Sequence, residues 1–112
     1  MLAIPLPPVL APIANQNSLE DMPHVFAINI SDPDTVLACN ATFLSVTSSN
    51  PGVLPVANIV FGGAPPNCSV TMTPIAETSG ISNIDISLTD GLFVVNQIFT
   101  MTFAIVNDAP TI

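Results

Sequence analysis

The side chains best suited to chemistry in this sequence are its eight acidic residues, and they have no basic partners. The 112-residue chain contains no Lys or Arg and a single His, so its formal net charge is −8. No carboxylate can therefore form an ion pair with a Lys or Arg of the same chain. Carboxylates that the fold brings together must be protonated or bound to a metal ion, and the others must lie apart.

Two of these acids, Asp32 and Asp34, flank Pro33 and form the best single candidate motif for a shared site. Asp and Pro both favour turns, and an Asp-x-Asp sequence in a tight turn places two carboxylates on one side. Asp90 precedes Gly91 in another turn signal and is a candidate third ligand. Such hard oxygen ligands suit Ca²⁺, which binds 6–8 of them.

The elements that position these acids are β-strands, because apolar residues recur with a period of two. Ile84, Ile86 and Leu88 alternate with polar residues, and a second alternating run places Phe99, Met101, Phe103 and Ile105 on one face. Proline and glycine turn signals separate these runs from further strands expected at 9–19, 24–31, 42–48, 54–61 and 68–73, with a loop at 62–67. The sequence therefore predicts an all-β fold, an antiparallel sandwich of about seven strands.

Alternating strand directions assign each turn to one of two ends of such a sandwich. Asp32, Asp34 and Asp90 then lie at the N-terminal end, and Asp85 lies on a strand. The C-terminal end receives the other acids, namely Glu20, Asp21, Glu77 and Asp108. We expect calcium ligands at both ends, with Glu20, Glu77 and Asp108 forming the second set. The alternative is that these acids occupy turns only because Asp favours turns and solvent.

Composition excludes several other functions. There is no Gly-x-Ser-x-Gly motif, and neither cysteine has a structured His partner, so we expect no enzyme. Cys39, Cys68 and His24 lack zinc-ligand spacing, and an isopeptide cross-link would need a lysine. Without cations the chain is unsuited to nucleic acid or anionic membrane, and no run is long enough for membrane insertion.

Short motifs occur in a fixed order along the chain. They are L-E-D near residue 20, I-S-D-P-D at 30–34, S-V-T-S-S-N at 45–50, N-I-V-F-G-G at 58–63, N-C-S-V-T-M-T-P at 67–74, I-D-I-S-L-T-D-G at 84–91 and V-N-D-A-P-T-I at 106–112. This ordered set resembles the cadherin-like tandem repeats of large bacterial RTX-type surface adhesins. The resemblance implies an extracellular, cell-surface Greek-key sandwich of cadherin-like or immunoglobulin-like type, with calcium at the junctions between repeats. It divides the chain into a proline-rich arm at 1–8, a sandwich at 9–106 and a linker at 107–112.

The sequence departs from this family at two places. The linker that ends a preceding repeat carries Asn-Asp-Ala-Pro in the family, whereas residues 5–8 here are Pro-Leu-Pro-Pro, so the upstream carboxylate is missing. Cys68 stands where we expect a basic residue in many relatives.

The two cysteines are predicted to form a disulfide. The strand order places Cys39 and the loop before Cys68 at the same end, and Cys68 has the inward parity of Val70 and Met72. Two small buried thiols are the alternative. The resemblance implies export to an oxidising compartment, which favours the bond.

The function predicted from these observations is that of a structural extender repeat, with calcium stiffening its junctions to neighbouring copies. A second hypothesis is a subunit of a surface filament or pilus-like homopolymer, in which the arm at 1–14 adds as a strand to a neighbour's sheet. A third is a carbohydrate-binding module, although the chain has no Trp or Tyr to stack on sugar rings.

Overall fold

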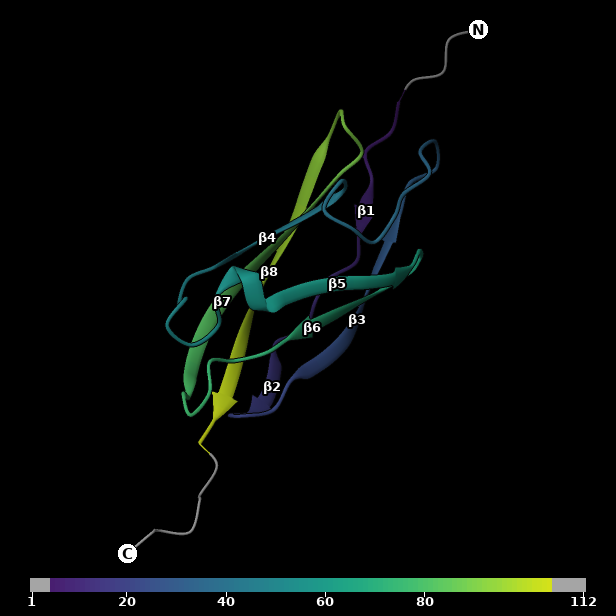
Figure 1. The fold of residues 1–112 in the computed structure, drawn as a ribbon. Helices are drawn as coiled ribbons and strands as arrows, with labels where there is room; N and C mark the ends of the chain where they lie inside the picture. The colour runs from purple at the N-terminus through teal and green to yellow at the C-terminus, as the bar shows by residue number, and fades with distance from the viewer. Residues whose placement is uncertain (1–4, 106–112) are drawn as a thin grey trace, which may run out of the picture.

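Residues 5–105 are described by the computed structural model, in which two four-stranded sheets pack face to face (Figure 1). One sheet has the order β1-β3-β6-β5 and the other has the order β2-β8-β7-β4. The strands are β1 (Val9–Leu10), β2 (Gln16–Leu19), β3 (His24–Ser31), β4 (Leu44–Ser48), β5 (Ile59–Ala64), β6 (Asn67–Met72), β7 (Gly80–Thr89) and β8 (Val94–Ala104). The predicted all-β sandwich is confirmed.

The first predicted strand, 9–19, is two strands in different sheets. β1 pairs antiparallel with β3, whereas β2 pairs parallel with β8, so the sandwich is not wholly antiparallel. Pro12 lies between them and has no N–H to continue a ladder. The chain crosses between the sheets there, and the count rises from about seven strands to eight.

The core consists of the inward halves of the alternating strands. Ile84, Ile86 and Leu88 of β7 are completely buried, as are Val70 and Met72 of β6. Burying each such side chain stabilises the fold by about 1.5–3 kcal/mol. The period of two therefore identified these core residues, with one exception: Ile105 was predicted to face inward but is exposed, because β8 ends at Ala104.

The strand predicted at 54–61 begins later and runs further. Leu54 is buried in a loop, a short 3-10 helix (η1, Val56–Asn58) follows, and β5 then continues through the glycines that we expected in a loop. Gly63 has a φ of 79°, and a Cβ there would lie 3.1 Å from the Asn67 carbonyl oxygen. Glycine therefore allows β5 to stay close to β6 up to the tight turn at Pro65–Pro66.

The predicted disulfide is present in the structure, between Cys39 and Cys68, with 5.5 Å between their Cα atoms. Both side chains are buried. The bond links the long β3–β4 connection to the start of β6, which pairs with both β3 and β5. It therefore holds an otherwise irregular segment against the centre of one sheet.

We predict that replacing both cysteines by alanine lowers the free energy of unfolding by about 3–4 kcal/mol. The bonded residues are 29 positions apart, and closing a loop of that length restricts the unfolded chain by about this amount. Urea unfolding of the oxidised chain and of the double variant measures the difference. A loss below about 1 kcal/mol would show that the bond does not constrain the unfolded chain.

Candidate metal centre

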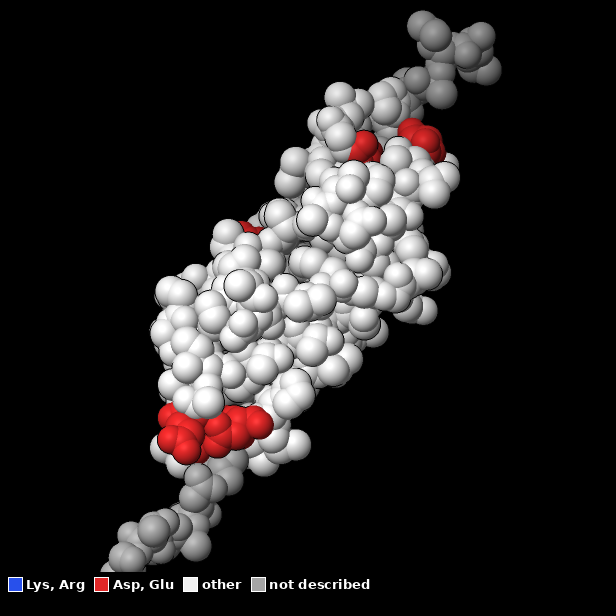
Figure 2. Space-filling view, in the orientation of Figure 1, with Lys and Arg blue, Asp and Glu red and all other residues white. Residues whose placement is uncertain are grey.

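The acidic side chains gather at the two ends of the sandwich, as the alternation of strand directions predicts (Figure 2). Asp32 and Asp34 follow the end of β3, and Asp90 lies in the turn between β7 and β8. Asp85 stands apart on β7, where its Oδ1 accepts a hydrogen bond from Asn96 Nδ2. The two sheets thus keep most of the negative charge away from their faces.

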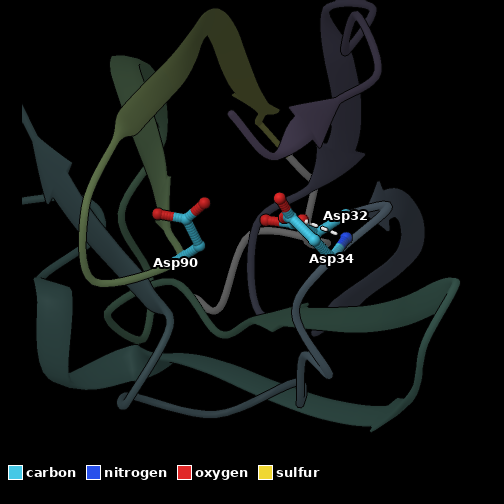
Figure 3. Close-up of side chains that lie close together, drawn as sticks. All are labelled: Asp32, Asp34 and Asp90. Carbon is cyan, nitrogen blue, oxygen red and sulfur yellow. Dashed lines mark hydrogen bonds between the residues drawn. The ribbon is translucent and has the colours of Figure 1, made fainter. Parts of the chain in front are cut away.

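Three carboxylates meet at the N-terminal end: those of Asp32, Asp34 and Asp90, which we call the aspartate cluster (Figure 3). One oxygen from each lies within 4.8 Å of the others. The first two side chains lie next to each other, and Asp90 faces them from the other sheet (Figure 3). The predicted combination of the two turns is therefore present in the structure.

Backbone N–H groups hold all three carboxylates in place, and the Leu6 N–H contacts Asp34. Asp32 Oδ1 accepts the Asp34 N–H at 2.9 Å, which closes the Asp-Pro-Asp turn. Asp90 Oδ1 accepts the N–H groups of Leu92 at 2.9 Å and Phe93 at 2.8 Å. Gly91, with a φ of 96°, provides the left-handed conformation that this turn needs.

The remaining oxygen of Asp32 is the least satisfied atom of the cluster. Asp32 Oδ2 is shielded from solvent and has no hydrogen-bond partner in the described part of the chain. A carboxylate oxygen without water or a donor is costly to bury, and a cation relieves that cost.

The carboxylates alter one another's protonation. The neighbouring carboxyl group of Asp34, together with desolvation, raises the pKa of Asp32 above its ordinary value. The carboxyl group of Asp32 and the hydrogen bond from the Leu6 N–H lower the pKa of Asp34. The N–H groups of Phe93 and Leu92 lower the pKa of Asp90. The cluster therefore favours one shared proton or a bound cation.

The geometry fits part of a calcium site. Oxygens on opposite sides of one Ca²⁺ are about 5 Å apart at most, so three oxygens within 4.8 Å of one another can contact the same ion. Three carboxylates are fewer than the 6–8 oxygen ligands that Ca²⁺ takes, so the remaining ligands would be water or another segment. An open depression of about 250 Å³, lined by Pro5, Asp34, Thr35, Asp90 and Leu92, leaves room for them.

The N-terminal arm contributes to this end in a way that the sequence did not reveal. The Leu6 N–H donates to Asp34 Oδ2 at 3.0 Å, and Pro5 lines the depression. The proline-rich departure from the family pattern at 5–8 was the signal available in the sequence. This departure indicated that the upstream carboxylate of the family is missing, but it did not predict that the Leu6 N–H would contact Asp34.

The second predicted set, at the C-terminal end, is only partly assembled in the described residues. Asp21 Oδ1 accepts the Glu77 N–H at 2.6 Å, and the Glu20 N–H donates to the Ala104 carbonyl. Within residues 5–105, however, the aspartate cluster is the one group of three or more potential ligands. Asp108 lies outside the described residues, so the set of Glu20, Glu77 and Asp108 stays a prediction.

Comparison with solved structures establishes the type of sandwich. The titin M4 domain matches with a TM-score of 0.61 and 9% identity over 91% of this chain and 100% of that chain. The fold is an immunoglobulin-like β-sandwich. The titin M3 domain matches with a TM-score of 0.60 and 13% identity, over 88% of this chain and 98% of that one. An endo-fucoidan hydrolase of glycoside hydrolase family 107 matches with a TM-score of 0.54 and 12% identity, over 89% of this chain and 14% of the hydrolase.

At these identities the immunoglobulin-like neighbours establish the fold alone. No protein-family model matches the sequence, and no curated protein matches it. Among residues 5–105, no helix is long and apolar enough to cross a membrane. The immunoglobulin-like fold is therefore established, and membership of the cadherin-like adhesin repeats stays a prediction from the sequence.

We predict that Asp32→Asn raises the melting temperature at pH 7 in the presence of a chelator. A raised pKa means that the folded state binds the proton more tightly than the unfolded state does. Its contribution to stability is present at low pH and is lost as the pH rises through the raised pKa. Asn imitates the protonated acid and keeps this contribution at every pH, so the gain should shrink as the pH falls towards about 3.

Thermal melts between pH 3 and pH 7 test this difference. Asp85→Asn is the matched control, because it also removes one negative charge and keeps the oxygen that Asn96 contacts. An equal gain for both variants would attribute the effect to net charge rather than to the aspartate cluster.

Proposed function

We propose that this chain is a structural module of an extracellular tandem-repeat protein, which extends a surface protein by linking end to end with similar modules. The observation that carries the proposal is the placement of the acids at the two ends of an immunoglobulin-like sandwich (Figure 2). The first and last described residues also lie at opposite ends (Figure 1). Modules joined in series would bring acidic ends together, where repulsion must be relieved.

Calcium is the cation that best suits such a junction. The aspartate cluster offers three oxygens to one ion and contains the unpartnered Asp32 Oδ2. The Pro5–Leu6 segment lies beside the same carboxylates, so a preceding module would enter next to them. Oxygens from that module would complete the coordination and make ion binding depend on the neighbour.

An extracellular setting is supported by the disulfide between Cys39 and Cys68. Such bonds persist in oxidising compartments and are rare in the cytosol of most organisms. The absence of Lys and Arg suits a role that does not require contact with anionic polymers.

The filament hypothesis has weaker support. Val9 and Leu10 already pair with Ile30 and Ser31 of their own sheet as β1. Donating the arm to a neighbour would require breaking this pairing, and Pro5, Pro7, Pro8 and Pro12 cannot donate backbone hydrogen bonds to a new ladder.

A carbohydrate-binding function also has little support. Phe26, Phe43 and Phe61 pack against the core, and Phe99 and Phe103 are buried, which leaves Phe93, at 37% exposed, as one aromatic ring that a sugar could contact. The similarity to the fucoidan hydrolase concerns the fold. One immunoglobulin-like neighbour comes from a complex of titin M10 with obscurin-like 1, and module-to-module contact is the role that we favour here.

We predict that calcium stabilises two copies in tandem more than it stabilises one copy. A ligand that binds only the folded state adds about 2.7 kcal/mol when its free concentration is 100 times the dissociation constant. The tandem protein completes the coordination at one junction, whereas a single module offers only part of it. Melting temperatures with calcium and with chelator, for both proteins, measure the difference.

Asp90→Asn is the sharpest variant for this experiment. It removes a charged ligand but keeps an Oδ1 that can accept the Leu92 and Phe93 N–H groups. It should reduce the calcium shift of the tandem protein, as should Asp32→Ala, Asp34→Ala and Asp108→Ala, whereas Asp85→Asn should not. Equal calcium shifts for one and two modules would contradict a junction site.

A further inference from the structure

The β5 edge of the sandwich is open and differs from the other three sheet edges. β5 pairs only with β6 and ends its sheet. The opposite edge, β1, is two residues long and is flanked by prolines, and β2 has four residues. In β4 the Leu44 N–H already donates to the Asn40 carbonyl at 2.9 Å. β5 is the longest of the four edge strands and has neither proline nor charge to block another strand.

The backbone groups that face this edge can be assigned from the ladder. The Thr73 N–H donates to the Asn58 carbonyl, so Asn58 bonds towards the β6 side. Because antiparallel strands alternate, Val60, Gly62 and Ala64 also bond towards β6. Ile59, Phe61 and Gly63 then direct their N–H and C=O groups outward, and no other segment of residues 5–105 pairs with them.

The outward groups are self-complementary. If Phe61 lies opposite the Phe61 of a second copy in antiparallel orientation, Ile59 lies opposite Gly63 and all three outward-directed residues find partners. A shift of the centre to Val60 would pair Gly63 with Ala57 in η1, outside the strand. A shift to Gly62 would pair Ile59 with Pro65, which has no N–H. The register centred on Phe61 therefore forms the most hydrogen bonds.

Side chains and charge favour the same arrangement. Phe61 is partly buried against the core, so its exposed part would be covered by the Phe61 of the second copy. Gly63 leaves room for the opposing Ile59. Although the chain carries a net charge of −8, none of the strands β1, β3, β5 and β6 contains an acidic residue. The edge is thus a place where two copies meet without opposing carboxylates in the contacting strands.

We propose that two copies of this chain associate laterally through their β5 edges, antiparallel and centred on Phe61, to form one continuous sheet. This contact goes beyond the proposed end-to-end linkage and uses neither acidic end. The two-fold axis reverses the second copy, so paired modules run in opposite directions. The arrangement therefore suits arrays that approach each other from opposite sides.

Sedimentation velocity of the 112-residue chain in chelator, over a range of concentrations, is the first test. We expect a dimer whose dissociation constant rises at least about tenfold in Phe61→Asp and in Phe61→Lys, because like charges would then lie directly opposite each other. An equimolar mixture of these two variants should restore the dimer. Circular dichroism melts establish that each variant is folded.

Val25→Asp is the matched control. Val25 is 61% exposed on β3 of the same sheet but lies away from the β5 edge. It should leave the dimer unchanged if the contact is edge to edge. Loss of the dimer in Val25→Asp, together with an unaffected Phe61→Asp, would overturn the proposal in favour of contact through the sheet face.

Amide hydrogen exchange tests the register without any substitution. The Phe61 and Ile59 amides should become protected only at concentrations where the dimer forms. The Val60 and Gly62 amides bond to β6 and should be protected at every concentration. A wild-type chain that stays monomeric at millimolar concentration, a mixture of the charged variants that stays monomeric, or a Phe61 amide that exchanges equally fast in monomer and dimer would each overturn the proposal.

Discussion

The absence of Lys and Arg is the constraint on which the rest of this structure depends. Every acid must be accommodated by solvent, by a proton or by uncharged hydrogen-bond donors, because no side-chain cation except His24 is available. The structure accordingly places the described acids other than Asp85 outside the strands, and the aspartate cluster uses the N–H groups of Leu6, Asp34, Leu92 and Phe93 as donors. These donors are fewer than the carboxylate oxygens brought together, which leaves Asp32 Oδ2 unpartnered and the aspartate cluster suited to a cation.

Without ion pairs, the stability of the folded domain must come from apolar burial and from the disulfide. The fully buried side chains belong largely to β6, β7 and β8, whose alternation leaves few polar atoms to satisfy inside. The buried serine, Ser82, is satisfied by the Ser48 hydroxyl at 2.7 Å and by the Asn50 N–H. The Cys39–Cys68 bond stabilises the long β3–β4 connection, which has little regular structure of its own. This connection also carries Asp32 and Asp34, so the disulfide and the candidate metal centre belong to one structural unit.

Sequence reasoning succeeded where a strand buries one face and failed at the edges. β3 has the predicted bounds and inward residues, because its neighbours on both sides enforce the period of two. β5 and the β1–β2 segment were misjudged because edge strands are half-exposed, so glycine, proline and helical turns are tolerated in them. For the aspartate cluster, the alternation of strand directions was enough to predict that Asp90 lies at the same end of the sandwich as Asp32 and Asp34. The Leu6 N–H contact depends on the path of an irregular arm, which has no periodicity to read.

The separation of charge from the sheet faces gives the module two physically different kinds of surface. Its ends carry carboxylates that repel one another at close range, so any end-to-end contact depends on a cation or on acid. Its β5 edge presents uncharged backbone groups and small or apolar side chains, so contact there depends on hydrogen bonding and on apolar burial. Salt and chelators act strongly on the first kind of contact and weakly on the second. If both proposed contacts form, calcium would control the end-to-end contact, and the lateral contact would be independent of calcium.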